Sequence, residues 1–263
     1  MGSASPQITL VDPRRFGGIA RLYGDAGLAA LRAAHVCVIG IGGVGSWVAE
    51  ALARSAVGRL TLIDLDHVAE SNTNRQIHAL EGNYGKAKVQ AMAERIGAIN
   101  PQCQVTIIED FAELDNLDDL LAPGFDWIID AIDNVRVKAA LIAWAGSRAQ
   151  PIITVGGAGG QLDPTRIRID DLARTIQDPL LSKVRARLRR VHGYARGPKT
   201  KFGVPAVYSD EPLIYPDAAC AADGEPAAGP QGLNCAGFGA SMCVTAGFGL
   251  AASAYVLRRL AKK

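Results

Sequence analysis

The sequence predicts an α/β fold: a doubly wound, mostly parallel sheet with helices on both faces. Two observations predict it. Short runs rich in β-branched residues alternate with longer helical runs between residues 35 and 159, and this alternation is typical of βαβ units. The first short run leads into GIGGVG at residues 40–45, the strand–turn–helix pattern of a Rossmann-like nucleotide-binding unit.

The elements follow one another in a regular order. Strands are expected at residues 35–41, 59–66, 104–110, 125–133 and 151–159, and the run 166–170 is expected to continue the sheet. Helices are expected between them at residues 46–57, 86–99 and 135–149. All three helical runs are long enough to cross from one strand to the next, so a parallel sheet follows.

The 263 residues are expected to form a single domain with three parts. Residues 14–177 form the nucleotide-binding core, residues 178–232 a basic helix and a mobile loop, and residues 233–263 a glycine-rich segment and a C-terminal helix. Hydrophobic residues make up 49% of the chain and charged residues 21%, as in an ordinary globular core. A net charge of +2 is too small to indicate nucleic-acid binding without a local cluster.

Cysteine usage and the chain's apolar stretches favour a cytoplasmic protein. Its five cysteines are widely spaced and none forms a C-x-x-C pair, which favours reduced thiols and argues against a zinc ribbon. No charged segment followed by an apolar run opens the sequence, so secretion is not expected. Residues 235–257 carry no charged side chain and approach the length of a membrane span. Because small residues dilute this stretch, we expect a buried terminal helix, with membrane association as the alternative.

The glycine turn predicts a phosphate site. Its glycines are Gly40, Gly42, Gly43 and Gly45. They permit a tight bend and let backbone N–H groups and a helix N-terminus approach a phosphate, although a packing turn without ligand remains the alternative. Asp64 ends the second expected strand, where a carboxylate accepts hydrogen bonds from both ribose hydroxyls, and Asp66 follows it. Up to this point NAD and ATP fit equally well.

The next segment separates these two nucleotides. Five polar residues follow the ribose aspartate: Asn72, Asn74, Arg75, Gln76 and Lys88. The two cations among them suit a triphosphate better than the pyrophosphate of NAD. Two aspartates, Asp130 and Asp133, then end the fourth expected strand, where ligands bind. Asp133 is expected to hold Mg²⁺ over the phosphates, with capping of the following helix as the alternative.

The motifs GIGGVGS, DLDHV, SNTNRQ, GKAKV and DAIDN resemble, in this order, those of the ubiquitin-activating-type adenylating superfamily. The resemblance covers residues 14–160 and implies an adenylating fold that binds ATP and Mg²⁺. It implies that Asp64 binds ribose, that Arg75 and Lys88 bind phosphates, and that Asp133 supports magnesium. In this superfamily an N-terminal arginine often reaches the ATP of the neighbouring subunit, and both Arg15 and Arg21 are candidates.

The second half departs from the members that activate sulfur carriers, because it lacks their paired C-x-x-C zinc ligands. Residues 156–190 and 234–242 instead resemble one branch, the tRNA threonylcarbamoyladenosine dehydratases. That resemblance implies ATP-dependent cyclisation of threonylcarbamoyladenosine beside the tRNA anticodon, a homodimer, and a link to a cysteine-desulfurase and sulfur-acceptor system. A monovalent cation is a further candidate ligand. The alternatives are an adenylating enzyme for a sulfur-carrier protein and a non-catalytic docking partner in sulfur relay.

A basic block agrees with an RNA substrate. Between residues 182 and 209 there is no acidic residue, and eight basic ones occur: Lys183, Arg185, Arg187, Arg189, Arg190, Arg196, Lys199 and Lys201. Such a block is typical of phosphate binding, and the interleaved Tyr194 and Phe202 could stack on unpaired bases. The alternative is a solvated helix face. Cys235, in the glycine-rich stretch, is a candidate reactive thiol, with a buried spectator cysteine as the alternative.

Overall fold

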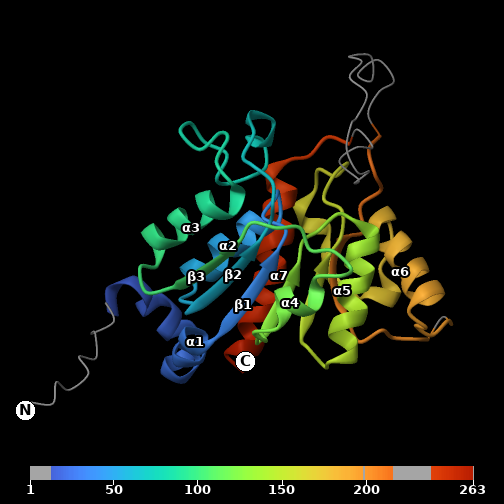
Figure 1. Ribbon diagram of the computed structural model, residues 1–263, viewed down its shortest axis with the longest axis horizontal. Helices are drawn as coiled ribbons and strands as arrows, with labels where there is room; N and C mark the ends of the chain where they lie inside the picture. The colour runs from blue at the N-terminus through green and yellow to red at the C-terminus, as the bar shows by residue number, and fades with distance from the viewer. Residues whose placement is uncertain (1–12, 198, 216–237, 263) are drawn as a thin grey trace, which may run out of the picture.

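The computed structural model describes residues 13–197, 199–215 and 238–262, which form one seven-stranded sheet between two layers of helices (Figure 1). The sheet has the order β3-β2-β1-β4-β5-β7-β6. Its strands are β1 His35–Ile39, β2 Arg59–Ile63, β3 Gln104–Ile108, β4 Trp127–Asp130, β5 Ile152–Val155, β6 Ile167–Asp171 and β7 Pro205–Ser209. Every neighbouring pair is parallel except β6 and β7, which are antiparallel. The predicted fold class is confirmed.

Seven α-helices and three short 3₁₀ helices connect the strands. The α-helices are α1 Pro13–Ala33, α2 Gly45–Arg54, α3 Lys88–Ile99, α4 Leu117–Leu121, α5 Val135–Ser147, α6 Pro179–Val191 and α7 Met242–Leu260. The 3₁₀ helices are η1 Glu70–Asn72, η2 Pro164–Arg166 and η3 Leu172–Arg174. These counts refer to the part of the chain that the structure describes.

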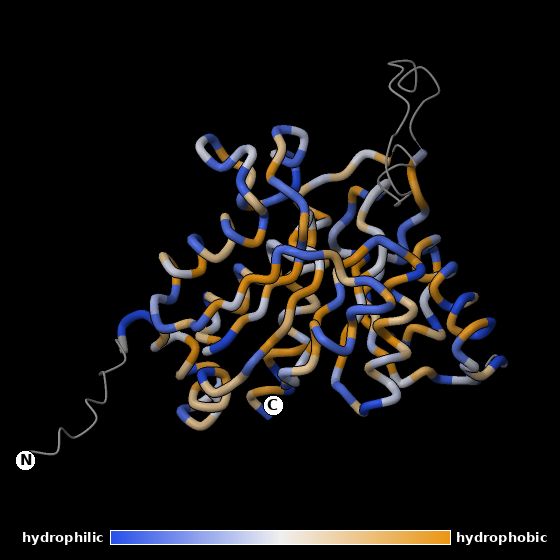
Figure 2. The backbone as a smooth tube through the Cα atoms, viewed as in Figure 1, coloured by the Kyte–Doolittle hydropathy of each residue, from blue (hydrophilic) through white to orange (hydrophobic). Residues whose placement is uncertain are grey.

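The core forms two layers because side chains alternate across each strand. On β1, Val36 and Val38 pack into the layer that contains α2, α3 and α7. Cys37 and Ile39 point to the other face and pack with α4, α5 and α6. The hydrophobic segments therefore run through the centre of the molecule, as Figure 2 shows. Each large apolar side chain buried this way contributes about 1.5–3 kcal/mol to folding.

The strand order reverses between β1 and β4. From β1 the chain proceeds outward through β2 to β3, and it then returns to place β4 on the other side of β1. In such sheets the connections diverge at this point and leave a crevice at the carboxyl ends of the two central strands, where ligands bind. The glycine turn follows β1 and the loop with Asp133 follows β4, so both predicted ligand segments flank this crevice.

One part of the predicted organisation is wrong. Residues 178–232 were expected to form a basic helix and a mobile loop, but Pro205–Ser209 within this part form β7, which lies between β5 and β6. Ala206 to Ser209 are buried, so this short apolar run is a core strand despite its Pro- and Gly-rich surroundings. Residues 210–215 continue the chain after β7, and residues 216–232 lie outside the described residues.

The C-terminal helix α7 packs into the core. It lies against α2 and the sheet, and Val244, Phe248 and Val256 are buried there. The prediction of a buried terminal helix is confirmed for this segment. Among the described residues, no helix combines the length and apolar character needed to cross a membrane.

Candidate nucleotide site

The glycine turn needs glycine for steric reasons at two positions. Gly40 has a φ of +87°, and a Cβ placed on it would lie 2.9 Å from the carbonyl oxygen of Ala131. A Cβ on Gly45 would lie only 1.7 Å from the carbonyl oxygen of Gly40. The N-cap of α2, Val44, offers no side-chain acceptor to the first N–H groups of the helix. The N–H groups of Ser46 and Trp47 already donate to the carbonyls of Gly42 and Val44, at 3.1 Å each. An anion at this turn would therefore meet the N–H of Gly45 and the positive end of the helix dipole.

Asp64 is held in place by backbone donors. The N–H of Ile41 in the glycine turn donates to its Oδ2 at 2.6 Å, and the N–H of Asp66 donates to its Oδ1 at 2.8 Å. Burial raises the pKa of Asp64, while the charge of Lys88 and the two N–H groups oppose this rise. A carboxylate oxygen can accept more than one hydrogen bond. Both oxygens thus retain acceptor capacity for ribose hydroxyls.

Arg75 lies directly on the glycine turn. Its Cγ and Cδ are 3.2 and 3.3 Å from the position of a Cβ on Gly43. The indole N–H of Trp47 on α2 donates to the Arg75 carbonyl at 2.9 Å, and Nη1 of Arg75 donates to the Ser71 carbonyl and to Oδ1 of Asn74. Burial lowers the pKa of Arg75. The structure thus places the aliphatic part of the Arg75 side chain against the predicted phosphate site, with its guanidinium on the adjoining loop.

Asn72 and Gln76 have different positions in the same turn. Asn72 is buried, and its Oδ1 accepts the N–H of Ala69 at 3.1 Å, so its side chain shapes the turn. Gln76 is also buried, with Nε2 4.0 Å from the position of a Cβ on Gly42. Its Oε1 has no hydrogen-bond partner among the described residues. Of the two, Gln76 is the one whose side chain reaches the glycine turn.

Lys88, the first residue of α3, is buried rather than exposed in an open pocket. Only 6% of its surface is accessible, and its Nζ contacts Oδ2 of Asp66 at 2.7 Å. The sequence did not predict this ion pair between two of its own candidate ligand residues. Because Asp66 is about half exposed, Lys88 can exchange this carboxylate for a phosphate without leaving either charge isolated.

A second ion-pair network fixes α3 relative to α2. Glu50 on α2 is buried and accepts two hydrogen bonds from Arg95 on α3, at 2.6 and 3.1 Å, and one from Arg54 at 2.7 Å. α2 begins at the glycine turn and α3 begins at Lys88, so this network sets the distance between the two phosphate-binding segments. Sequence reasoning missed Glu50, which lies on the buried face of an apolar helix.

Asp133 is free to bind a cation. The loop that carries it lies against the glycine turn, because the N–H of Ala131 donates to the Ile39 carbonyl at 2.9 Å. Asn134 alone caps α5, with its Oδ1 accepting the N–H groups of Arg136 and Val137. Asp133 is exposed and has no hydrogen bond or ion pair with a described residue. The alternative in which Asp133 itself caps the helix is therefore wrong.

The described residues contain no cluster of three or more His, Cys, Asp or Glu side chains suited to a metal ion. A magnesium ion at Asp133 would thus have one carboxylate from the protein and its remaining ligands from phosphates and water. Magnesium commonly binds in this way at nucleotide sites. The residues present fit Mg²⁺ delivered with a nucleotide rather than a resident metal centre.

The N-terminal part of α7 closes one side of the site, which the sequence did not predict. The carbonyl of Ala240 accepts a hydrogen bond from Nδ2 of Asn74 at 2.9 Å. Cγ2 of Thr245 lies 3.6 Å from the position of a Cβ on Gly43. No sequence signal marks a contact between residues 166 positions apart. Cys235, the predicted reactive thiol, lies outside the described residues.

The two N-terminal arginines are remote from the phosphate site of their own chain. Arg15 donates to the carbonyls of Ala98 and Ile99, at the end of α3 opposite to Lys88. At 1.5 Å per residue the length of α3 separates these ends by about 17 Å. Arg21 is exposed on α1, and Figure 1 shows α1 beyond the amino end of β1, away from the glycine turn.

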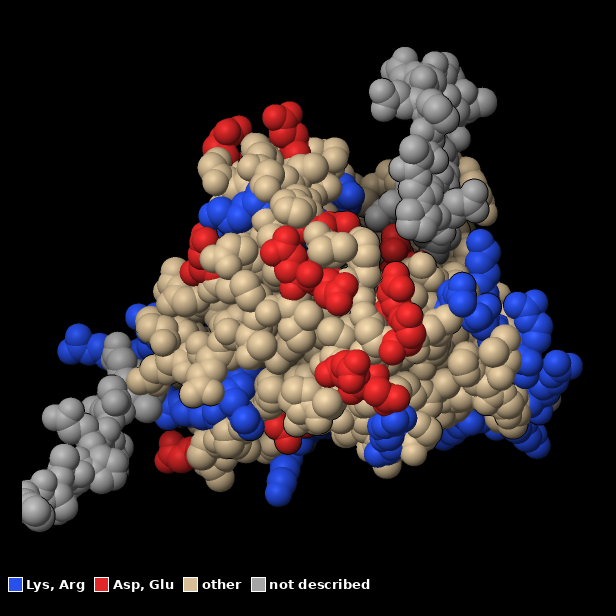
Figure 3. All heavy atoms as spheres, viewed as in Figure 1, with Lys and Arg blue, Asp and Glu red and all other residues tan. Residues whose placement is uncertain are grey.

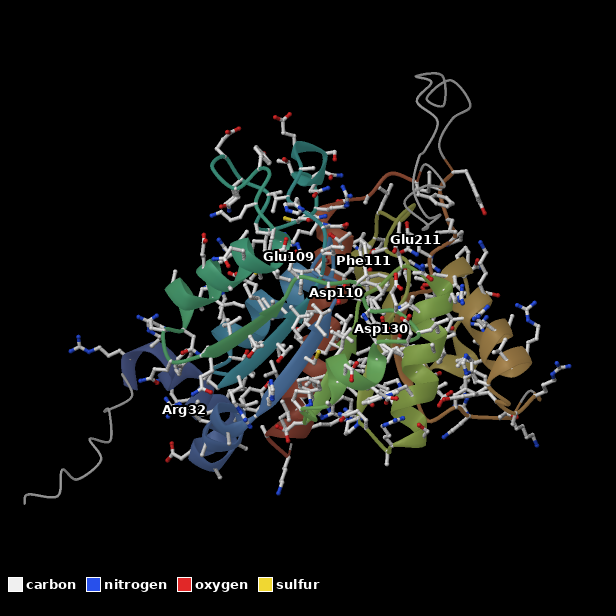
Figure 4. The ribbon with its side chains drawn as sticks, viewed as in Figure 1. Arg32, Glu109, Asp110, Phe111, Asp130 and Glu211 are labelled. Atoms are coloured by element: carbon white, nitrogen blue, oxygen red, sulfur yellow. The ribbon has the colours of Figure 1, made fainter. Side chains whose placement is uncertain are left out.

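A basic surface covers α6 (Figure 3). Arg189, Arg190 and Arg196 line an open hollow of about 590 Å³ on this helix and the loop after it. Arg185 is half-buried and donates to the hydroxyl of Thr175, so not every arginine of the block is available to a ligand. By contrast, acidic residues dominate the mostly exposed stretch 109–119, which runs from the end of β3 into α4 and of which Figure 4 labels a part.

The interpretation of Tyr194 and Phe202 as free stacking platforms is not supported. Both rings are half-buried against the core beside α5 and pack edge-to-face on each other, with centroids 4.9 Å apart. The guanidinium of Arg189 lies 5.3 Å from the centre of the Phe202 ring. These aromatic side chains therefore anchor the basic loop to the protein instead of presenting open faces to bases.

Comparison with known proteins gives a consistent picture. Residues 17–195 match the ThiF family. The tRNA threonylcarbamoyladenosine dehydratase of Escherichia coli is 52% identical over 253 residues, which cover 95% of this chain and 94% of that protein. The dehydratase of Bacillus subtilis is 41% identical over 191 residues, or 73% of this chain and 72% of that protein.

Solved structures and a relative with another activity refine this picture. The crystal structure of the Escherichia coli dehydratase with ATP has a TM-score of 0.86 and 49% identity, covering 96% of this chain and 97% of that one. The molybdopterin-synthase adenylyltransferase of Salmonella typhimurium is 34% identical over 136 residues, only 52% of this chain. The match to the dehydratases thus extends well beyond the nucleotide-binding half.

Proposed function

The chain belongs to the ThiF family, and from this premise we propose that it is an ATP-dependent tRNA threonylcarbamoyladenosine dehydratase. The observation that carries the proposal is the extent of the match. The dehydratases of Escherichia coli and Haemophilus influenzae align with 95% of the chain and that of Bacillus subtilis with 73%, whereas a sulfur-carrier adenylyltransferase aligns with about half. The phosphate turn, the ribose carboxylate and the free Asp133 supply the ATP site that this reaction needs.

ATP is the proposed co-substrate, with its phosphates over the glycine turn and its ribose at Asp64. The N–H of Gly45 at the start of α2 would meet the phosphates, and the guanidinium of Arg75 would turn to them from Ser71 and Asn74. Lys88 moves from Asp66 to a phosphate when the nucleotide binds. Mg²⁺ held by Asp133 supplies further charge neutralisation. The site has more positive charge than the pyrophosphate of NAD requires, which is why ATP is favoured.

The chemistry proposed is activation of a carboxylate that is otherwise inert. An oxygen of the substrate carboxylate attacks the α-phosphorus of ATP, the bond to pyrophosphate breaks, and a mixed anhydride with AMP forms. The tethered ureido nitrogen then attacks the acyl carbon with high effective molarity. AMP leaves with the former carboxylate oxygen, and the ureido proton passes to a base or to water. The substrate thus loses the elements of water, and Arg75 and Lys88 stabilise the charge that develops at phosphorus.

The tRNA is proposed to lie across α6. Its phosphates would meet Arg189, Arg190 and Arg196 around the hollow on this helix, and counterion release would favour the contact. The acidic stretch 109–119 would repel the RNA backbone and restrict the approach to the basic side (Figure 3). A tRNA substrate also implies a cytoplasmic enzyme.

The assembly is proposed to be a homodimer in which Arg15 or Arg21 serves the neighbouring subunit, because neither reaches its own phosphate site. Mixing an arginine variant with Asp133→Ala tests this, since heterodimers would regain one intact site. An absence of complementation at every mixing ratio would mean that each site is built within one chain. A cysteine-desulfurase partner and a monovalent cation remain further proposals, which co-purification and activity in different chloride salts can test.

Mass spectrometry of tRNA nucleosides tests the function. Incubation of tRNA that contains threonylcarbamoyladenosine with enzyme and Mg-ATP should yield a nucleoside lighter by one water. Omitting ATP should prevent the change, and so should Arg75→Ala, which removes the guanidinium beside the glycine turn. Unchanged tRNA, together with adenylation of a carrier protein that ends in glycine, would instead establish the sulfur-carrier alternative.

A further inference from the structure

A lysine is buried at the base of the β4–α5 loop. Lys138 is fully inaccessible to solvent, although it lies in the first turns of α5. Its Nζ donates to Oδ2 of Asp130 at 2.8 Å, to the hydroxyl oxygen of Thr154 at 3.0 Å and to the carbonyl of Asp130 at 3.3 Å. An ammonium group has three donors, so every donor of Lys138 has an acceptor.

Its partner Asp130, labelled in Figure 4, is equally buried, and both of its carboxylate oxygens accept hydrogen bonds. Oδ2 accepts from Lys138 and, at 2.7 Å, from the hydroxyl of Thr154 on β5. Oδ1 accepts the N–H of Ile132, the second residue of the loop, at 3.1 Å. The cluster therefore connects the end of β4, the neighbouring strand β5 and the first turns of α5.

Stability does not account for this cluster. Removing two charges from water is expensive, and a buried ion pair often gives no net gain over apolar residues of similar volume. A lysine near a helix N-terminus also opposes the helix dipole. What the pair supplies is a fixed geometry: it constrains the β4–α5 loop at its beginning through Asp130 and at its end through Lys138.

This loop carries Asp133, whose own side chain has no partner among the described residues. Its position depends on the backbone alone: Ala131 is tied to β1, Ile132 to Asp130, and Asn134 caps α5. We propose that Lys138 is a positioning residue, whose ion pair with Asp130 fixes this loop so that Asp133 can hold magnesium on the nucleotide. The proposal rests on the proposed function of Asp133.

The test replaces both charges by neutral groups of similar size, Asp130→Asn with Lys138→Met, so that no unpaired charge is buried. The matched control is Asp118→Asn with Arg148→Met, which removes the ion pair at the other end of α5. Thermal unfolding reports stability, equilibrium dialysis reports ATP affinity without magnesium, and dehydration assays across a magnesium series report the metal requirement.

We expect the Asp130→Asn, Lys138→Met protein to melt near the wild type and to bind magnesium-free ATP normally. Its magnesium concentration for half-maximal activity should rise about tenfold, equivalent to a loss of about 1.4 kcal/mol in metal binding. The control should keep the wild-type magnesium dependence. A normal magnesium requirement in the test protein would overturn the proposal, and so would an equal loss of magnesium-free ATP affinity, because the cluster would then support the whole pocket.

A milder variant guards against a failure to fold. Thr154→Val removes one hydrogen bond from Asp130 and one from Lys138 but keeps the ion pair, so it should raise the magnesium requirement by a smaller factor. An unchanged requirement in this variant counts against the proposal. Asp133→Ala distinguishes the role of Asp133 from the role of Lys138. If this variant has a normal magnesium dependence, Asp133 does not hold magnesium, whatever result the Lys138 variant gives.

Discussion

Replacing Asp178 by asparagine should change the pH dependence of stability. Asp178 caps α6, with only 4% of its surface exposed. Its Oδ1 accepts the N–H of Leu181 at 2.8 Å, and its Oδ2 accepts the N–H of Gly157 at 3.0 Å. Burial raises the pKa of Asp178 to about 6, which these hydrogen bonds and the charge of Lys138 only partly oppose.

The sign and size of the effect follow from this shift. Because the folded-state pKa lies above the unfolded value of 3.8, the folded protein keeps a proton that the unfolded chain releases. The stabilisation is complete below the unfolded pKa and is lost as the pH rises through about 6. A shift of about two units corresponds to about 3 kcal/mol.

An asparagine at this position cannot ionise, yet its carbonyl oxygen can still cap the helix. The amide nitrogen of the new side chain cannot accept the N–H of Gly157, which costs about 1–3 kcal/mol at every pH. Relative to the wild type, the free energy of unfolding of the Asp178→Asn protein should therefore rise by up to about 3 kcal/mol between pH 4 and pH 7. Urea unfolding of both proteins across this pH range measures the difference in their free energies of unfolding. The contributions of all other titrating groups are the same in both proteins and cancel in this difference. A difference that stays constant with pH would refute the reasoning, because the carboxyl would then titrate normally in the folded protein.

Three further outcomes are expected. His78→Leu should make the protein less sensitive to acid, because burial lowers the pKa of His78 to about 4 in the folded protein. The free energy of unfolding of the wild type therefore falls by up to about 3 kcal/mol as the pH drops from the unfolded pKa of His78 through about 4. Melting curves of both proteins near pH 7 and pH 4.5 should show a smaller decrease for the variant. Gly45→Ala should abolish ATP binding in calorimetry, because the new Cβ would overlap the Gly40 carbonyl; normal affinity would mean that the turn can relax. Neutralising Arg190 and Arg196 should make the salt dependence of tRNA binding shallower by up to about two units of slope, with ATP affinity unchanged; equal slopes would place the RNA elsewhere.

The phosphate turn, Asp64 and Asp133 could be predicted because their placement is local. A strand that ends in glycines or an aspartate puts those residues at the carboxyl edge of a parallel sheet, whatever the rest of the fold does. Lys88 shows the limit of this reasoning. Its position in the chain was sufficient to make Lys88 a candidate phosphate ligand. Its burial and its ion pair with Asp66, however, depend on how α3 packs.

Other features depend on long-range contacts that no local pattern specifies. β7 is a short apolar run in a Pro- and Gly-rich region, and only its pairing with β5 and β6 makes it a strand. Lys138 did leave a signal: it is a charged residue within an otherwise apolar helical run, one turn before Leu141 and Ile142. A charge on a buried face requires a partner, and Asp130 at the preceding strand end was available.

Asp178 connects the two surfaces that the proposed reaction must bring together. One carboxylate oxygen caps the basic helix α6, and the other holds the loop after β5 at the edge of the nucleotide crevice. Gly156 permits this approach, because a Cβ there would lie 1.9 Å from Oδ2. An ionised carboxylate at this position reduces stability at neutral pH, so stability alone does not explain the residue. Its geometric role does, since an acceptor on each side sets α6, the proposed RNA-binding helix, at a fixed distance from the proposed ATP site.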